Sequence, residues 1–519
     1  MTPNKALEFA EKFVRYTIIA LFGGIIFFLF VSSFFTTCSI PEINEVVLYG
    51  RDFFVKHIIA ILAILFFGVI AKKKKLSRYI NDKLVFAVAC CVVGIYAAFI
   101  CSTQLELISD QKNCFVSATQ FLDGIYIAWK PERYAGRYPN QNGLILFFAF
   151  IQTLFGKGNA LVLQFINLVS AVISVVFMSR ISELAFGCEK KRNTALILLM
   201  YAPMMLYVTF TYGTMIGLCL SVIGIYYQMS FLKSGKWYGA VISAVCIPSA
   251  VMFKSNYLIV LVASVLVYLF CALYKRKIRN AIVVVLLICV YMLTSVGVNT
   301  IIEKKTGMEI SKGVPTVAWI TMGMSESKRG PGWYSGYNEQ LYFDAGYDSE
   351  KAHVQGVEDL KERIDFFKSD LKYTSDFFVK KVLSMWSEPS FQSLWIQFVK
   401  PHQTEFPQWI TDLFEVDSTV NRWYCQIYDI WQTATYFFVL VYLALNTKKI
   451  KIYQLLPGII MLGGFLFHLF WEAKGQYSVI YFFLIMPYAI SGFLNLTDIL
   501  CNIFSRSQKE KAVDMKAEN

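Results

Sequence analysis

Polar side chains that can take up a proton or bind an anion collect in residues 102–156, between apolar parts of the chain. Asp110 follows Ser109 at the start of an amphipathic run, so either residue could be the helix N-cap, and Asp110 could also be an accessible carboxylate. The apolar side chains of that run recur at helical spacing at Cys114, Phe115, Ala118, Leu122 and Ile125. Arg133 and Arg137 follow, and arginine can hold an anion in a bidentate contact or reach lipid headgroups. We expect this stretch to lie at a water-facing membrane surface, with its first helix along that surface.

The composition indicates a membrane protein. Of the 519 residues 56% are hydrophobic, and apolar runs of about 15 to 21 residues recur along the chain. We therefore predict an all-α polytopic membrane protein and exclude a soluble fold. The first apolar run is too long for a signal peptide and lacks a small-residue cleavage site, so it is predicted to be a retained span. The 12 Cys lie mostly inside apolar runs without metal-ligand spacing, and we interpret them as core residues.

We predict about twelve membrane spans from the lengths of the apolar runs. They lie at residues 17–36, 54–71, 84–101, 160–179, 194–210, 213–231, 239–253, 257–273, 281–300, 431–446, 453–470 and 477–497.

Clusters of Lys and Arg orient these spans, because cytoplasmic loops carry an excess of both residues. The clusters are KKKKLSR at 72, SRISELAFGCEKKRN at 179, KSGK at 233, KRKIRN at 275, TKKIK at 447 and SRSQKEK at 505. They place both termini in the cytoplasm. Three apolar runs separate the first two clusters, so one of them does not cross. We predict that the shortest, 144–156, stays at the outer surface.

The loop 301–431 then lies outside. It holds 19 of the 36 acidic residues but 14 of the 49 basic ones. The net charge of +13 thus reflects topology and anionic lipid, and we expect no nucleic-acid partner. The aromatic residues of the loop could stack on sugar rings or form an interfacial belt. We interpret the loop as a cover that binds the acceptor.

Four segments in this order resemble GT-C glycosyltransferases, the polyprenyl-phosphate-sugar enzymes that include protein O-mannosyltransferases and the lipid A aminoarabinose transferase. They are SDQKNCFVSATQFLDG with RYPNQNG and a run ending in LFG, then CEKKRN, MFKSNYLIV and FWEAKGQYSVIYF. The resemblance covers residues 84–300 and 431–497. It implies a GT-C-like core at 84–300 with the external loop 102–156. Residues 1–83 would be two additional spans, 301–431 an external region, and 432–519 the last spans and a cytoplasmic tail.

The resemblance also implies a reaction and its residues. A sugar would pass with inversion from a polyprenyl-phosphate donor to a hydroxyl of a cell-surface glycan or protein, outside a bacterial cell membrane. Asp110 would be the general base, and Arg133, Arg137, Lys254 and Lys474 would contact phosphate. The other substrate-binding residues would be Tyr138, Asn140, Gln141, Asn256, Glu472 and Tyr477.

The chain departs from the family at two places. Thr214 stands where a second carboxylate is often found, and Arg137 and Tyr138 replace an acidic residue before Pro139. A bound divalent metal is therefore possible but not supported by the sequence, and no cofactor is predicted.

Other interpretations stay open. Lys474 could simply pair with Glu472. The chain as a whole could be a lipid-linked glycan flippase or transporter, although the ionisable residues collect outside the spans. A polysaccharide polymerase or ligase with a lipid-diphosphate donor is a third possibility.

Overall fold

The computed structural model describes residues 3–41, 43–275, 277–399, 406–416 and 418–517. Within these residues, nine helices are long and apolar enough to cross a membrane. They are α1 (Pro3–Ser33), α2 (Phe54–Lys73), α3 (Asp82–Thr103), α7 (Leu161–Phe186), α10 (Thr214–Ser234), α12 (Leu258–Lys275), α13 (Ile278–Thr306), α21 (Leu456–Phe470) and α22 (Gly475–Ala517). The prediction of a helical, multi-pass membrane protein is confirmed, because about 20 apolar helical residues match the hydrocarbon thickness of a bilayer.

Three of the predicted spans do not coincide with any of these nine helices. Residues 239–253 form α11 (Trp237–Phe253), which has 17 residues, and 431–446 form the second half of α20 (Thr419–Asn446). Residues 194–210 do not form one helix. They include the end of α8 (Cys188–Leu199), then α9 (Ala202–Met205) and η4 (Leu206–Thr209). Pro203 has no amide hydrogen to continue α8, so the chain turns there. The total of twelve spans stays a prediction.

The long helices are held together by extensive helix–helix packing. α10 packs against α7 and α11, and α20 packs against α22 and α1. A Cβ atom added at Gly492 of α22 would lie 2.0 Å from the carbonyl oxygen of Phe438 in α20. Glycine is therefore required at this crossing, as at other tight crossings of membrane helices.

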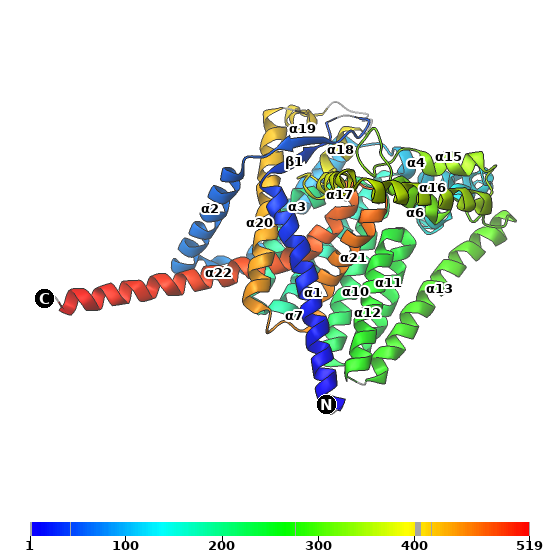
Figure 1. Cartoon of the computed structure of the whole chain (residues 1–519). Coiled ribbons are helices and arrows are strands. Elements are labelled where there is room, and N and C mark those ends of the chain that lie inside the picture. The colour runs from blue at the N-terminus through cyan, green and yellow to red at the C-terminus, as the bar shows by residue number, and fades with distance from the viewer. Residues whose placement is uncertain (1–2, 42, 276, 400–405, 417, 518–519) are drawn as a thin grey trace.

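An outer layer of short helices covers one end of the bundle (Figure 1). From residues 102–156 come α4 (Ser109–Leu122), η2 (Ile127–Trp129), α5 (Tyr134–Arg137), η3 (Pro139–Gln141) and α6 (Asn142–Phe155). From the later loop come α14 (Thr316–Gly323), α15 (Tyr337–Asp344), α16 (Ser349–Ser369), α17 (Leu371–Trp386), α18 (Ser393–Phe398) and α19 (Gln408–Phe414). Asp348 and Asp370 cap α16 and α17 by accepting backbone amide hydrogens.

The amphipathic run after Asp110 is shorter than predicted. α4 ends at Leu122, and Ile125 lies beyond it with its side chain exposed. α6 has 14 residues and packs against α4 in the outer layer, where the charge pattern predicts that 144–156 stays. Its non-crossing topology remains a prediction.

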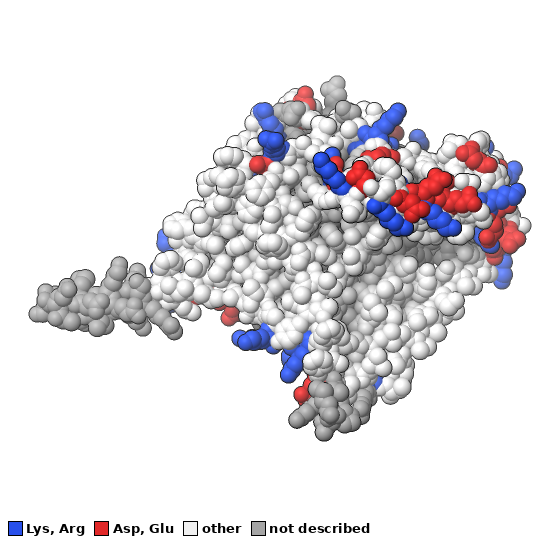
Figure 2. Space-filling model, in the orientation of Figure 1, with Lys and Arg blue, Asp and Glu red and all other residues white. Residues whose placement is uncertain are grey.

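Charged side chains are unevenly spread over the visible surface. Figure 2 shows them over α15, α16 and α17 of the outer layer and near the N-terminal end, with a broad and almost uncharged surface between. Such a band suits contact with lipid tails.

Between α1 and α2 in the sequence, the chain forms a two-stranded antiparallel sheet. This sheet was not predicted. β1 (Thr36–Ser39) pairs with β2 (Leu48–Arg51), with Thr36 opposite Arg51. The amide of Cys38 also donates to the carbonyl of Ser387, at 2.8 Å. Strands of four residues give too little alternation to be recognised in a sequence.

Three short 3-10 turns complete the architecture. They are η1 (Leu76–Tyr79), η5 (Ser255–Tyr257), which leads into α12, and η6 (Ile452–Leu455), which leads into α21.

Candidate functional site

A cavity of about 1120 Å³, the site cavity, lies between the outer layer and the adjoining ends of the bundle helices. Ten of the eleven site residues named from the sequence line it: Asp110, Arg137, Tyr138, Asn140, Gln141, Lys254, Asn256, Glu472, Lys474 and Tyr477. They come from α4, from α5 and η3, from the turn after α11, and from the turn between α21 and α22. Segments far apart in the sequence thus meet at one place.

Arg133 is the exception. It is exposed and precedes α5, whose single turn carries Tyr134 and Arg137 into the cavity wall, whereas Arg133 does not line it. This position does not support its predicted contact with phosphate.

Asp110 lies in the first turn of α4 and faces the site cavity. The N-cap position is held by Ile108, and no side chain caps the helix, so the N-cap interpretation of Asp110 is not supported. Its side chain is accessible from the cavity, although protein surrounds it. Burial raises the pKa of Asp110, and Lys474 and hydrogen bonds with Tyr134 and Tyr212 oppose the rise. An accessible carboxylate with a raised pKa suits proton transfer.

The two tyrosines beside Asp110 come from different segments. Their hydroxyl oxygens, in Tyr134 of α5 and Tyr212 before α10, lie 3.3 Å apart. Gly213 follows with a φ of +73°, and a Cβ atom there would lie 2.1 Å from the carbonyl oxygen of Phe253. Glycine therefore lets the Tyr212 segment lie against the end of α11, which leads to Lys254.

Lys254 is buried among neutral groups. α11 ends at Phe253, and Lys254 continues in extended backbone. Its Nζ donates a hydrogen bond to Thr214 Oγ1 at 2.9 Å. It also lies 5.0 Å from the ring centre of Tyr212 and 5.5 Å from that of Tyr477, within the range of cation–π attraction. In the described part of the chain no carboxylate forms a direct ion pair with it.

Burial lowers the pKa of Lys254 to about 7, and the charge of Lys474 acts in the same direction. The charges of Asp110 and Glu472 oppose the shift. An anion placed next to Lys254 would favour its charged form. The cavity therefore contains a cationic position whose charge is not neutralised by direct contact.

Lys474 is the second cation, and it lies in a more acidic setting. Its Nζ is 3.7 Å from Glu45 Oε1 and 3.7 Å from Glu472 Oε1. Burial alone would lower the pKa of Lys474, but the charges of Glu45 and Glu472 outweigh burial, and the pKa is raised. Tyr477 donates to Glu472 Oε2 at 2.9 Å. The pair inferred from the sequence is thus present, with an unpredicted third member in Glu45.

Lys381 of α17 holds the turn that carries Glu472 and Lys474. Lys381 is buried, and its Nζ donates to the carbonyl oxygens of Gly323, Leu469 and Trp471. Leu469 is in the last turn of α21, whose final carbonyl groups have no amide partner within the helix. Lys381 therefore fixes the end of α21 and the start of the turn.

Arg137 already has a partner. It forms an ion pair with Glu339 of α15, and Tyr138 and Tyr334 each donate to Glu339 Oε1, at 2.8 and 2.9 Å. A phosphate bound by Arg137 would have to compete with Glu339. The predicted phosphate role is therefore better matched by Lys254 than by Arg137.

The site cavity also has an apolar wall. α12 contributes residues at helical spacing, among them Leu258, Val262 and Leu266, and α21 contributes Leu462 and Leu466. α12 and α21 are in contact, and Val262 and Leu266 are 51% and 55% exposed. Side chains exposed on a membrane span face lipid tails. The polar end of the cavity is therefore continuous with an apolar groove between two spans.

Several charged and tyrosine residues of this site were not predicted from the sequence. Glu45, Arg329 and Glu339 line the cavity, and Arg329 forms an ion pair with Glu45. They lie in segments outside the four motifs, and no spacing in the sequence connects them to Asp110. Tyr134 and Tyr212 were beside the motif residues, so a search for hydroxyl groups near Asp110 could have included them.

The arrangement can bind an anion at Lys254 and transfer a proton at Asp110, and its apolar groove can accept a hydrocarbon chain. Comparison of the chain with models of known families, with curated proteins and with solved structures finds no match.

Proposed function

We propose that the protein is a GT-C-like glycosyltransferase that moves a sugar from a polyprenyl-phosphate donor to an acceptor hydroxyl outside the cytoplasm. About twelve spans, cytoplasmic termini and a bacterial cell membrane belong to this proposal. The observation that carries it is the site cavity. It joins an accessible carboxylate, a buried lysine without a direct ion pair and an apolar groove between α12 and α21.

The groove and the lysine fit the two ends of such a donor. The polyprenyl chain would lie along Val262 and Leu266 of α12, where exposed apolar side chains already line the cavity. The phosphate would then reach Lys254, which Thr214 and the surrounding rings hold in place. Preorganised cations of this kind stabilise the charge of a departing phosphate.

Asp110 supplies the proton acceptor. The acceptor oxygen forms a bond to the anomeric carbon while the bond from that carbon to the phosphate oxygen breaks. The hydroxyl proton passes to Asp110, and the polyprenyl phosphate leaves with its electron pair and negative charge beside Lys254. A single displacement inverts the anomeric centre.

The aromatic rings of the outer layer support sugar binding. Trp319 of α14 and Trp471 line the site cavity, and their rings stack with centres 5.8 Å apart. Aromatic faces are common platforms for apolar faces of ligands. The acceptor, a cell-surface glycan or protein, would enter beneath this layer.

The test is transfer of sugar from a polyprenyl-phosphate donor to an envelope glycan extract. Asp110→Asn keeps the size of the side chain but removes its basicity, so we expect transfer to fall about 100-fold or more. The donor should still bind. Asp123→Asn is the matched control, since Asp123 in the same segment forms an exposed ion pair with Lys157, and such pairs contribute little.

Four results would count against the proposal. Normal transfer by Asp110→Asn would remove Asp110 as the base, and equal loss in both variants would indicate disruption of the loop. Donor movement across vesicle membranes without any transfer would favour the transporter, and transfer from a lipid diphosphate alone would favour the polymerase or ligase.

A further inference from the structure

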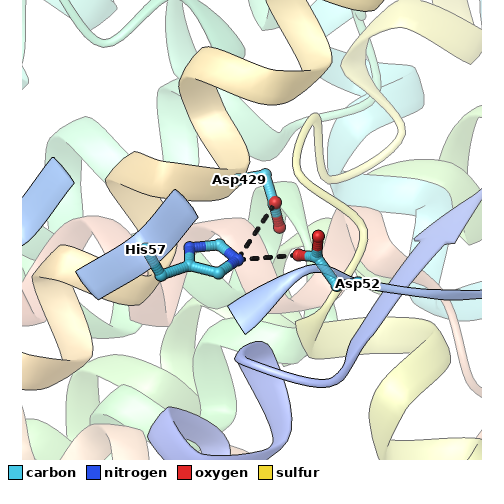
Figure 3. Close-up of side chains that lie close together, drawn as sticks. All are labelled: Asp52, His57 and Asp429. Carbon is cyan, nitrogen blue, oxygen red and sulfur yellow. Dashed lines mark hydrogen bonds and ion pairs between the residues drawn. The ribbon is translucent and has the colours of Figure 1, made fainter. Parts of the chain in front are cut away.

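A second cluster of ionisable groups lies where α2 begins beside α20, and none of its members lines the site cavity. Asp52 lies two residues before the first residue of α2, His57 is in the first turns of α2, and Asp429 comes from α20. Figure 3 shows the two carboxylates pointing toward the same ring nitrogen of His57. His57 Nε2 is 2.7 Å from Asp52 Oδ2 and 3.5 Å from Asp429 Oδ2.

The three side chains are the kinds that bind transition metals, and they are almost closed off from solvent. The exposed fraction is 0% for the His57 side chain and 4% for each carboxylate. One donor atom from each residue lies within 4.8 Å of the other two. Imidazole with carboxylates is a donor set for Zn²⁺ and similar cations, which bind at about 2.0–2.2 Å to each ligand. A small inward movement would bring all three donors to one ion.

Charge in the cluster is incompletely balanced. Lys56 Nζ lies 2.5 Å from Asp52 Oδ1 and 2.6 Å from Asp429 Oδ2, so one ammonium group serves two buried carboxylates. Asp429 Oδ2 has these ionic contacts but accepts no hydrogen bond in the described structure. Buried carboxylates without full compensation are unfavourable. A divalent cation would supply the charge that Lys56 alone does not.

Lys56 is the most exposed member of the cluster. Its side chain is 29% exposed, and with Asp429 it borders a second cavity of about 290 Å³. An ion could enter through this cavity while Lys56 turns toward solvent.

We propose that Asp52, His57 and Asp429 form a site for a divalent transition cation of the Zn²⁺ type, and that Lys56 occupies its place when the ion is absent. The ion would join the segment before α2 to α20. That segment includes β2, which pairs with β1, and the turn between the strands carries Glu45 into the site cavity. The site is separate from the proposed transfer chemistry and does not depend on it.

The experiment uses the full-length protein in detergent, freed of metal with a chelator and titrated with Zn²⁺ and with Co²⁺. We expect one tightly bound equivalent, a higher melting temperature, and a Co²⁺ absorption spectrum of a site with nitrogen and oxygen ligands. His57→Phe and Asp429→Asn should each weaken binding by about 100-fold, following the usual effect of losing a metal ligand or its support. Asp376→Asn, in an exposed pair with Lys380, is the matched control and should bind as wild type does.

Lys56→Met separates a metal site from a simple ion-pair network. If Lys56 competes with the ion, its removal should tighten Zn²⁺ binding by about tenfold or more, because a competing positive charge is lost. If the cluster is only structural, Lys56→Met should be destabilised and Zn²⁺ should not restore its melting temperature, and the proposal is then wrong. Should this variant not fold, Lys56→Gln serves instead. Wild-type binding that persists unchanged in His57→Phe would also overturn the assignment.

Discussion

Lys254 gives the proposed reaction a specific dependence on pH. Its pKa is lowered to about 7 by burial, with Lys474 acting in the same direction. Lysine is charged below its pKa and neutral above it, so an anionic donor should bind best below about pH 7. A phosphodiester keeps its single negative charge throughout this range, so Lys254 is the group that changes.

The size of the effect follows from the pKa. Half of the free protein carries the charge at about pH 7, and the charged fraction falls about tenfold for each further pH unit. From pH 7 to pH 9 we therefore expect kcat/KM for the donor to fall about 50-fold, which corresponds to about 2.3 kcal/mol. On the acid side, activity should rise with pH as Asp110 loses its proton, and this limb lies above the usual range of Asp because burial raises that pKa. Together the two limbs give a bell-shaped dependence of kcat/KM on pH.

The assay is transfer at donor concentrations well below KM, in buffers from about pH 5 to 9. Lys254→Arg keeps a charge at every pH, so its alkaline decline should disappear. Lys254→Met should be weak at every pH and show no such decline. Lys157→Met, which alters an exposed lysine outside the cavity, should keep the wild-type profile. An alkaline decline that is absent from wild type, or equally present in Lys254→Met, would refute the role of Lys254.

Two further predictions concern Arg137 and the topology. Arg137→Ala should lower transfer less than Lys254→Met does and should leave membrane insertion intact, because Glu339 already pairs with Arg137; sugar transfer and protease resistance of the two variants in membranes measure this, and an equal or larger loss would show that Arg137 binds phosphate directly. A single reporter cysteine beside Lys157 should react with a membrane-impermeant reagent from outside the cell, since 144–156 is predicted not to cross. Labelling only from the cytoplasmic side would contradict the orientation.

The sequence identified the residues that come from segments at the ends of apolar runs. Lys254 and Lys474 stand out because positive charge is disfavoured on the outer side, and Asp110 stands out at the start of an amphipathic helix. These are local signals, and the structure brings all three residues to one cavity. Arg133 shows the limit of such signals, since it shares a motif with Arg137 but is on the exposed side of the turn before α5.

The partners of these residues could not be predicted in the same way. Glu339 of α15 pairs with Arg137 of α5, and this placement depends on the packing of the outer layer. The loop 301–431 has no apolar run that fixes its position against the bundle. The helix break before Pro203 could have been predicted from the sequence, because proline ends a helix. The apolar run continues through Pro203, however, and this favoured the prediction of an unbroken span.

Glu45 connects the first part of the chain to the site cavity. Residues 1–83 are predicted from the sequence to be an addition to a core that begins at residue 84, but the turn between β1 and β2 carries Glu45 into the cavity wall. There it contacts Lys474 at 3.7 Å and pairs with Arg329. Without Glu45, the Lys474 charge would be balanced by Glu472 and Asp110 only, and Arg329 would lose its carboxylate partner in the described structure. The cavity would then carry more positive charge and favour a donor with more than one phosphate. Residues 1–83 therefore contribute a negative charge to the cavity, which in the proposed reaction favours a donor with a single phosphate.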